Sequence, residues 1–437
     1  MYKMKKIYIL LGLAFTALLN ISEAYGQTTI DAEFRPRTEF RQGFRKPLAD
    51  SLTPAFVTLQ RTRFNADYKS KILNTRISLE DSRIWGNTDL KSNSTKVAVY
   101  EAWFEYLVSS GLSLQMGRQP LKYDDNRIFS SPVWSNVGIA HDAVVLKYKS
   151  PFIQVHTGYA YNNSKDTLLN VKYAYTPKQN YKALGYLWLS KSVFKGTTLS
   201  MIGVYEGFET KANYNTVVPR LTYGGNLFFA DESSKWGATL TAYGQQGKNP
   251  NKIYGNGFAD LNSYFWAVKL SYKYKENLMF NGGIDCYSGS ETTIDAGSSN
   301  TFNRLYGAPH NFNGYMEYFA ALPTQGLLDY YGGIATKIST KLGAELSGHL
   351  FYFDKDFYYK NEKTDKHLGS EVDLVLNYLV SNEISIQGGY CTYFNSDATK
   401  KYFNMDGVAT HSPQWAYLML TISPQLYRTP PLTETKS

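Results

Sequence analysis

The sequence predicts an all-β protein, a closed antiparallel transmembrane β-barrel of about eighteen strands. In the stretch IDAEFRPRTEFR (30–41) every odd position is charged and every even position is uncharged. This period of two places all six charges on one face of a β-strand. Tight polar turns alternate with longer polar loops, as in outer-membrane barrels, and 37 Tyr and 24 Phe are spread over the whole chain.

The first 26 residues have the pattern of a secretory signal peptide. Lys3, Lys5 and Lys6 precede the apolar run IYILLGLAFTALL, and Ala24 and Gly26 form a small-residue cleavage motif. No later stretch approaches the ~18 to 20 apolar residues of a membrane helix. We therefore expect cleavage near Gly26 and insertion of the mature chain into the outer membrane of a Gram-negative cell.

Residues 27–437 contain no linker or change in composition, so we expect one barrel domain. The turn-length pattern predicts strands at 28–42, 56–68, 72–85, 96–108, 112–120, 142–149, 152–162, 180–191, 197–207, 216–228, 236–247, 259–273, 278–289, 326–338, 342–354, 367–380, 384–396 and 413–424. An even count returns the C-terminus to the periplasm. Keeping each tight turn periplasmic requires that 303–319 belong to a long extracellular loop, 290–325, which could fold toward the lumen.

Charged residues of the first strands are expected to face lumen water, because an Arg or Lys on the lipid face costs about 2–4 kcal/mol at the bilayer midplane. Two interpretations stay open: a track for anionic solutes, or an ion-pair network that braces the wall. Pro36 cannot donate to a ladder, so we expect a bulge or bend there. The predicted lumen residues of the first strands are Glu33, Arg35, Arg37, Glu39, Arg41, Arg61, Arg63, Arg76, Glu80, Glu101 and Glu105.

Four motifs resemble the alginate export family of outer-membrane barrels. They are FRPRTEF near the start, SLEDSRIWG (78–86), GLSLQMGRQPLKYDDNRIFSSPVWSNVGIAHDAVVLKYK (111–149) and FNRLYGAPHNFNGYMEYF (302–319). The resemblance implies an eighteen-stranded, arginine-lined pore that exports an acidic polysaccharide, with loops folded over or into the channel. Its implied pore residues are Arg35, Arg37, Asp81, Arg83, Arg118, Asp125, Arg127, Asp142 and His310.

Arg118 fits this assignment only with a bulge. It shares the parity of Leu112, Leu114 and Met116, so it reaches the lumen only if the strand is irregular, and Gly117 is the expected place.

Other functional classes have little support. Cys286 and Cys391 form no C-x-x-C pair, which indicates packing residues and neither a disulfide framework nor a zinc site. None of the six histidines lies in a nucleophile motif; His349 with Ser347 is the one pair that a barrel hydrolase could use.

We therefore expect a passive channel for anionic solutes or acidic saccharides. It should need no cofactor, metal or nucleic acid, and its partner would be outer-membrane lipid. The alternative is a plugged scaffold or adhesion barrel. A net charge of +9, or +7 without the signal peptide, is compatible with either class.

Overall fold

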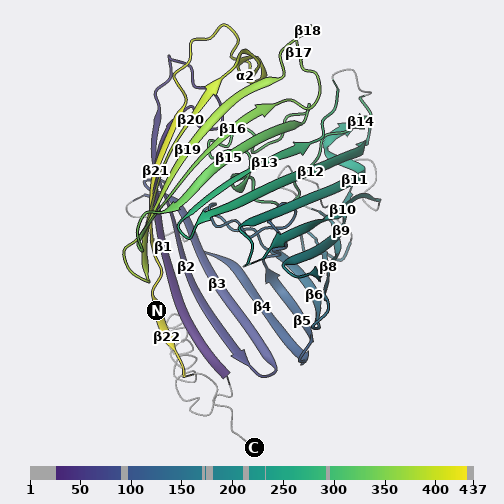
Figure 1. The fold of residues 1–437 in the computed structure, drawn as a ribbon. Helices are drawn as coiled ribbons and strands as arrows, with labels where there is room; N and C mark the ends of the chain where they lie inside the picture. Colours follow the sequence, from purple (N-terminus) through teal and green to yellow (C-terminus); the bar gives the residue numbers. More distant parts are fainter. Residues whose placement is uncertain are drawn as a thin grey trace, which may run out of the picture.

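The computed structural model describes residues 26–89, 97–169, 173, 181–209, 216–231, 233–291 and 296–430, so the predicted signal peptide lies outside the described residues apart from Gly26. Within these ranges, eighteen long strands form one antiparallel barrel (Figure 1). They are β1 (Gly26–Gln42), β2 (Ala55–Ser70), β3 (Leu73–Ile84), β4 (Ala98–Ser109), β5 (Leu112–Gln119), β6 (His141–Lys149), β7 (Gln154–Tyr161), β8 (Ala183–Phe194), β9 (Thr197–Glu209), β10 (Val217–Ala230), β11 (Trp236–Tyr254), β12 (Gly257–Lys275), β13 (Leu278–Tyr287), β15 (Leu327–Lys337), β16 (Leu342–Tyr352), β19 (His367–Leu379), β20 (Ile384–Asn395) and β21 (Gln414–Ile422).

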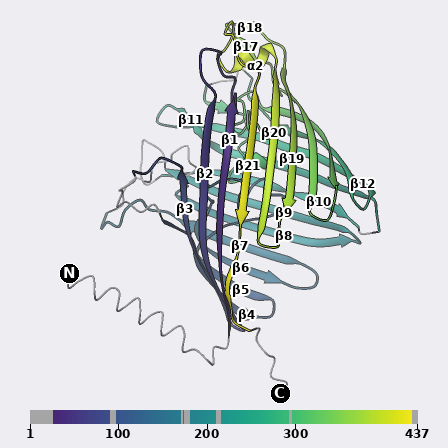
Figure 2. The same ribbon diagram turned by 90° about the vertical axis from the view of Figure 1, so that its left-hand side faces the viewer.

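The first and last long strands close the barrel. β1 pairs with β2 on one side and with β21 on the other, with Arg35 opposite Arg61 and Glu39 opposite Tyr417 (Figure 2). A closed sheet leaves no unpaired edge, which is what the interior of a bilayer requires. The predicted eighteen-stranded antiparallel barrel is confirmed, with differences at strand ends such as the continuation of β11 to Tyr254.

Alternation sorts the side chains between the two faces. In β12, Leu261, Ser263 and Phe265 point inward and are buried, whereas Tyr264 and Trp266 are exposed on the outside. Phe34 and Phe64 are likewise exposed, beside buried Arg35 and Arg61. This arrangement presents apolar side chains to lipid, whereas the lumen face carries charged residues as well as buried apolar ones such as Phe265.

Short elements occupy the ends of the barrel. β14 (Ser298–Ser299), the β17–β18 hairpin (Tyr358–Tyr359 and Glu362–Lys363) and α2 (Asp397–Tyr402) belong to the long connections, and β22 (Gln425–Arg428) continues along the start of β1 at the opposite end. We call these the loop end and the turn end. None of the described helices has the length and apolar character needed to cross a bilayer.

The irregularity expected at Pro36 is absent. Pro36 pairs with Gln60 of β2 in unbroken register. The pairing of β1 with β21 keeps one register from Phe34 to Gln42, and neither Arg35 nor Pro36 has a partner on β21. The missing N–H is therefore accommodated by a gap in one ladder instead of a bulge.

Candidate functional site: the lumen and its two cavities

Two long loops fold into the barrel and pack against each other. They are loop 120–140, between β5 and β6, and the described part of loop 288–326, between β13 and β15. Phe129 and Tyr306 form a parallel bridge, and the Tyr306 amide donates to the Ile128 carbonyl over 3.0 Å. As the sequence predicted, 303–319 contains no strand; it has one turn of 3-10 helix, η1 (Pro309–Asn311).

One wall of the lumen is rich in arginine and binds loop 120–140. Arg35 and Arg61 both donate to the Val133 and Ser135 carbonyls, with 3.0 Å between each guanidinium and the Ser135 oxygen. Arg61 also pairs with Glu33 at 2.7 Å, so both guanidinium groups are bound, although Nε of Arg35 has no hydrogen-bond partner among the described residues.

The other predicted charges of this wall also have partners. Arg37 and Arg41 each lie 2.8 Å from a Glu39 oxygen. The remaining contacts are Arg63 with Glu80, Arg76 with Asp67 and Glu101, and Glu105 with Lys147. Pairing of this kind supports the bracing interpretation for most of the wall, and a role in solute passage stays a prediction for these residues.

The opposite wall carries carboxylates and binds both loops. Arg127 of loop 120–140 donates to both oxygens of Asp285 on β13, at 2.6 and 3.1 Å. Asp329 on β15 accepts from the Asn313 amide at 3.0 Å, and Glu371 on β19 accepts from the Met316 backbone N–H at 2.6 Å. Asp285 and Asp125 raise the pKa of Arg127 well above its usual value despite burial, so it remains charged.

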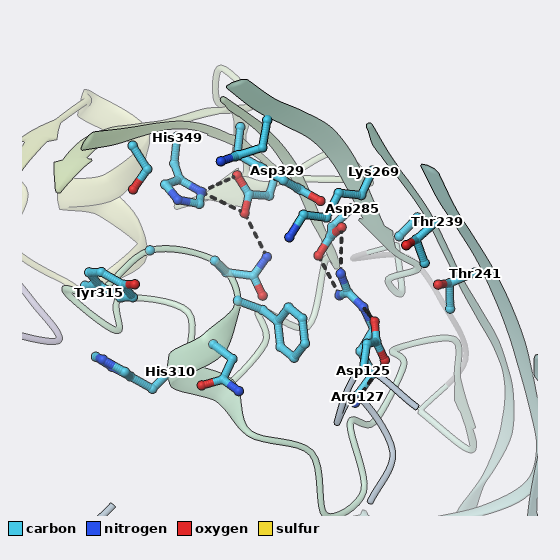
Figure 3. A pocket seen from close by; sticks show the side chains of 18 of the residues that line it. Asp125, Arg127, Thr239, Thr241, Lys269, Asp285, His310, Tyr315, Asp329 and His349 are labelled. Carbon is cyan, nitrogen blue, oxygen red and sulfur yellow. Dashed lines mark hydrogen bonds and ion pairs between the residues drawn. The ribbon is translucent and has the colours of Figure 1, made fainter. Parts of the chain in front are cut away.

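Two cavities lie on either side of η1. The inner cavity, of about 290 Å³, is lined by wall residues such as Lys269, Asp285 and Asp329 together with 310–315 (Figure 3). The outer cavity, of about 520 Å³, lies nearer the loop end and is lined by residues of β1 and of 132–137. Among the described residues, His310 and Asn311 border both cavities, so we call 308–311 the partition.

A stack of side chains holds the partition. The His310 ring lies between Trp134 and Tyr315, with centroid distances of 4.1 and 4.9 Å, and the Arg37 guanidinium covers the other face of Trp134 at 3.8 Å. Nδ1 of His310 is 2.9 Å from an oxygen of Glu317. Figure 3 shows His310 and Tyr315 side by side, across the inner cavity from Arg127 and Asp285.

The lumen position assigned to Arg118 and Asp142 is wrong. Arg118 pairs with Ala102 and Asp142 in regular register, so Gly117 forms no bulge despite its φ of +122°. Alternation therefore places Arg118 and Asp142 on the outer face, where they form a 3.2 Å ion pair. By the same parity Asp81 and Arg83 lie on the outer side of β3, paired at 2.6 Å, with Arg83 also at the rim of the outer cavity.

Sequence reasoning missed several residues of the cavities. Arg45 and Glu317 form an ion pair beside the outer cavity, Trp134 forms the centre of the stack, and Lys269 lines the inner cavity without an ion pair to any described residue. Lys269 has the parity of the buried Phe265 and Ala267, so alternation could have found it. Arg45, Trp134 and Glu317 lie in loops, where no periodicity marks them.

His349 on β16 bonds to a carboxylate of the neighbouring strand β15. Its Nδ1 lies 3.0 Å from Asp329, and no hydrogen bond joins it to Ser347 among the described residues. Cys286 and Cys391 are buried and unpaired. Within the same residues, no group of three or more His, Cys, Asp or Glu side chains could hold a metal ion.

Comparisons with known proteins identify the fold class. No family model matches the chain, and no curated protein does. Among solved structures, Pseudomonas aeruginosa OccD3 (OpdP) matches 92% of each chain at 12% identity with a TM-score of 0.60. Acinetobacter baumannii OccAB1 matches 92% of this chain and 97% of its own at 11% identity and a TM-score of 0.61.

The outer membrane protein opdK of P. aeruginosa matches 92% of this chain and 99% of its own at 12% identity and a TM-score of 0.57. The chain therefore has the fold of the eighteen-stranded outer-membrane porins.

Proposed function

We propose that this protein is an outer-membrane porin through which small solutes diffuse passively, and that it favours anionic solutes, including acidic saccharides. The observation that carries this proposal is the outer cavity. Arg37, Arg41 and Arg45 line it against Glu39 and Glu317, with Arg83 at its rim, so cations exceed carboxylates. Charge rings that line a channel set its ion preference.

Arg41 and Arg45 are the groups best placed to attract an anion. Their side chains are 31% and 63% exposed, whereas those of Arg35 and Arg61 are buried against loop carbonyls. Arg45 faces Glu317, but its exposure leaves room for a solute carboxylate. Arginine binds carboxylates in a bidentate manner, which suits it to acidic solutes.

The size of the cavities favours short solutes. Volumes of about 290 and 520 Å³ are those of sites for small molecules, and the partition separates them. Export of an acidic polysaccharide is supported by the motif resemblance alone, and it would require the partition to move aside. We therefore place monomers and short oligomers ahead of a polymer.

A plugged scaffold is the second candidate, because the two loops and the partition fill much of the lumen. Single-channel recording in planar bilayers, with a potassium chloride gradient, separates the two functions. The porin should conduct and prefer chloride, and the Arg41→Ala/Arg45→Ala double variant should shift the reversal potential toward the potassium value. Arg118→Ala, on the outer face, is the matched control and should leave it unchanged.

Two other results would contradict the proposal. Absence of conductance by a folded barrel would support the scaffold. Potassium preference that the double variant does not alter would mean that the carboxylates neutralise the cavity arginines.

We also propose that residues 1–26 are removed during export and that 27–437 form one barrel domain. The charged and apolar pattern of the first residues supports cleavage near Gly26. N-terminal sequencing of protein purified from outer membranes should find Gln27 first.

A further inference from the structure

His310 has an unused hydrogen-bonding atom beside the two cavities. Its Nδ1 is bonded to Glu317, which Arg45 also holds at 2.8 Å. Nε2 has no hydrogen-bond partner among the described residues, yet it is not one of the enclosed polar atoms that lack partners. Because His310 borders both cavities, Nε2 is open to the space that a solute occupies.

The surroundings fix which ring nitrogen carries the proton. Burial raises the pKa of the Glu317 carboxyl, but His310 and Arg45 outweigh burial and hold it below its usual value, so the carboxylate is ionised and accepts the Nδ1 proton. Burial lowers the pKa of His310 itself, so the ring is neutral at pH 7. In that tautomer Nε2 is an acceptor with a free lone pair.

Other charges around the ring do not reverse this state. Arg37 lies beyond Trp134 and lowers the pKa of His310, whereas Asp373 on β19 raises it to a smaller extent than Glu317 does. The ring faces are covered by Trp134 and Tyr315, so a solute can reach the imidazole only at its edge.

We infer that His310 is a specificity-determining residue of the pore. Its Nε2 accepts a hydrogen bond from a solute hydroxyl while Arg41 and Arg45 of the outer cavity bind the solute carboxylate. This inference rests on the proposed function and narrows it to hydroxylated acids, the class to which sugar acids belong. A bare carboxylate offers no donor to Nε2, because its oxygens only accept. Solutes without hydroxyls therefore leave the atom unpaired at the moment of passage.

The experiment compares two six-membered ring acids, glucuronate and cyclohexanecarboxylate. Each replaces chloride on one side of a bilayer holding the full-length porin at pH 7.5, and the reversal potential gives its permeability relative to chloride. Wild type should favour glucuronate by about three- to tenfold, the effect of one net hydrogen bond. Equal permeability, or preference for the hydroxyl-free acid, would overturn the inference.

Two variants separate a solute contact from a structural role. His310→Asn keeps an amide near the Nδ1 position, where it can still bind Glu317, but has no atom at Nε2; it should lose the discrimination. His310→Gln places an amide near the Nε2 position and should retain most of it. The opposite pattern, with Gln losing and Asn retaining discrimination, would show that the bond to Glu317 governs passage and would overturn the inference.

Controls distinguish failure of this inference from failure of the proposed function. His411→Asn alters a histidine that bonds the Leu52 carbonyl away from both cavities, and it should behave as wild type. Chloride preference over potassium should persist in every variant. A wild type without chloride preference contradicts the proposed function, whereas chloride preference without discrimination between the acids contradicts only the role of His310.

Discussion

Arg127 binds both carboxylate oxygens of Asp285, which lies 158 residues further along the chain. The pair is almost fully buried, with Tyr287 and Asp125 also bonded to the guanidinium at 3.0 and 2.8 Å. It fastens loop 120–140 to the wall formed by β13. The loop that narrows the lumen is thus held by an ion pair that the barrel interior shields from water.

Arg127→Ala should destabilise the protein and widen the channel. Removing one partner of a buried pair leaves an uncompensated carboxylate and typically costs about 3–5 kcal/mol. We expect a lower melting temperature in detergent and a larger, noisier single-channel conductance. Lys273→Ala, which breaks an exposed pair with Glu276 that contributes little to stability, is the control, and an equal effect of both changes would contradict the prediction.

Arg61→Ala should affect the steadiness of the current more than its ion preference. The guanidinium holds the carbonyls of Val133 and Ser135, so its loss frees one attachment of loop 120–140. Current noise and open-state lifetimes should change. The reversal potential in a salt gradient should stay near the wild-type value, and a shift as large as that of the Arg41→Ala/Arg45→Ala variant would show that Arg61 sets selectivity.

Gly314→Ala should displace the segment that follows the partition. Gly314 has a φ of +79°, and a Cβ atom there would lie 2.6 Å from the carboxyl carbon of Glu371. Gly407→Ala isolates the backbone effect, because Gly407 has a φ of +73° with nothing within 4 Å of the added atom. The control should lower the free energy of unfolding by about 1–2 kcal/mol, the cost of the left-handed conformation, and Gly314→Ala should lower it clearly more. Urea unfolding followed by tryptophan fluorescence measures both values.

Acid should loosen the partition. Burial depresses the pKa of His310 below 6.5, so its stabilising contribution is full above that value and is lost as pH falls. Despite the opposing effect of burial, His310 and Arg45 depress the pKa of Glu317 below 4.5, so its contribution is present above 4.5 and is lost as pH falls through the lower folded value. Protonation of either group therefore lowers the stability of the fold as pH falls.

The melting temperature should fall as pH is lowered from above 6.5 to below 4.5. Below pH 4.5 the Glu317→Gln variant should show a smaller fall, because it has no carboxyl left to protonate there. Glu276→Gln, at a carboxylate that is 91% exposed, should follow the wild-type curve. A wild-type melting temperature that rises in acid would contradict the sign of this prediction.

A new charge should destabilise the protein much more at one residue of β16 than at its neighbour. Leu346 is exposed on the outer face, whereas Ser347 lines the inner cavity. Leu346→Arg should cost about 2–4 kcal/mol if it lies near the midplane of the bilayer, and Ser347→Arg much less. Unfolding by urea in lipid vesicles measures the difference, and equal costs would mean that the assigned faces are wrong.

Alternation and turn length were sufficient to predict the barrel. A strand has a side-chain period of two, and a lipid face tolerates few charges, so the face of Arg35 and Arg61 could be assigned from their neighbours alone. The same rule places Arg118 outside. The bulge invoked to bring it inward came from the motif resemblance, and the structure shows that alternation was correct.

The partners of these residues depended on the tertiary structure. Arg35 and Val133 are 98 residues apart, and Glu317 and Arg45 are 272 residues apart. A loop has no periodicity from which its contacts could be calculated, and its path is chosen by which wall groups can satisfy its backbone and charges. The sequence by itself therefore determined the strands, their faces and the closure of the sheet, because these follow from local geometry and the cost of charge in lipid. Only the packing of the two loops inside the closed wall decided the cavities, the partition and the position of His310, because those depend on contacts between distant segments.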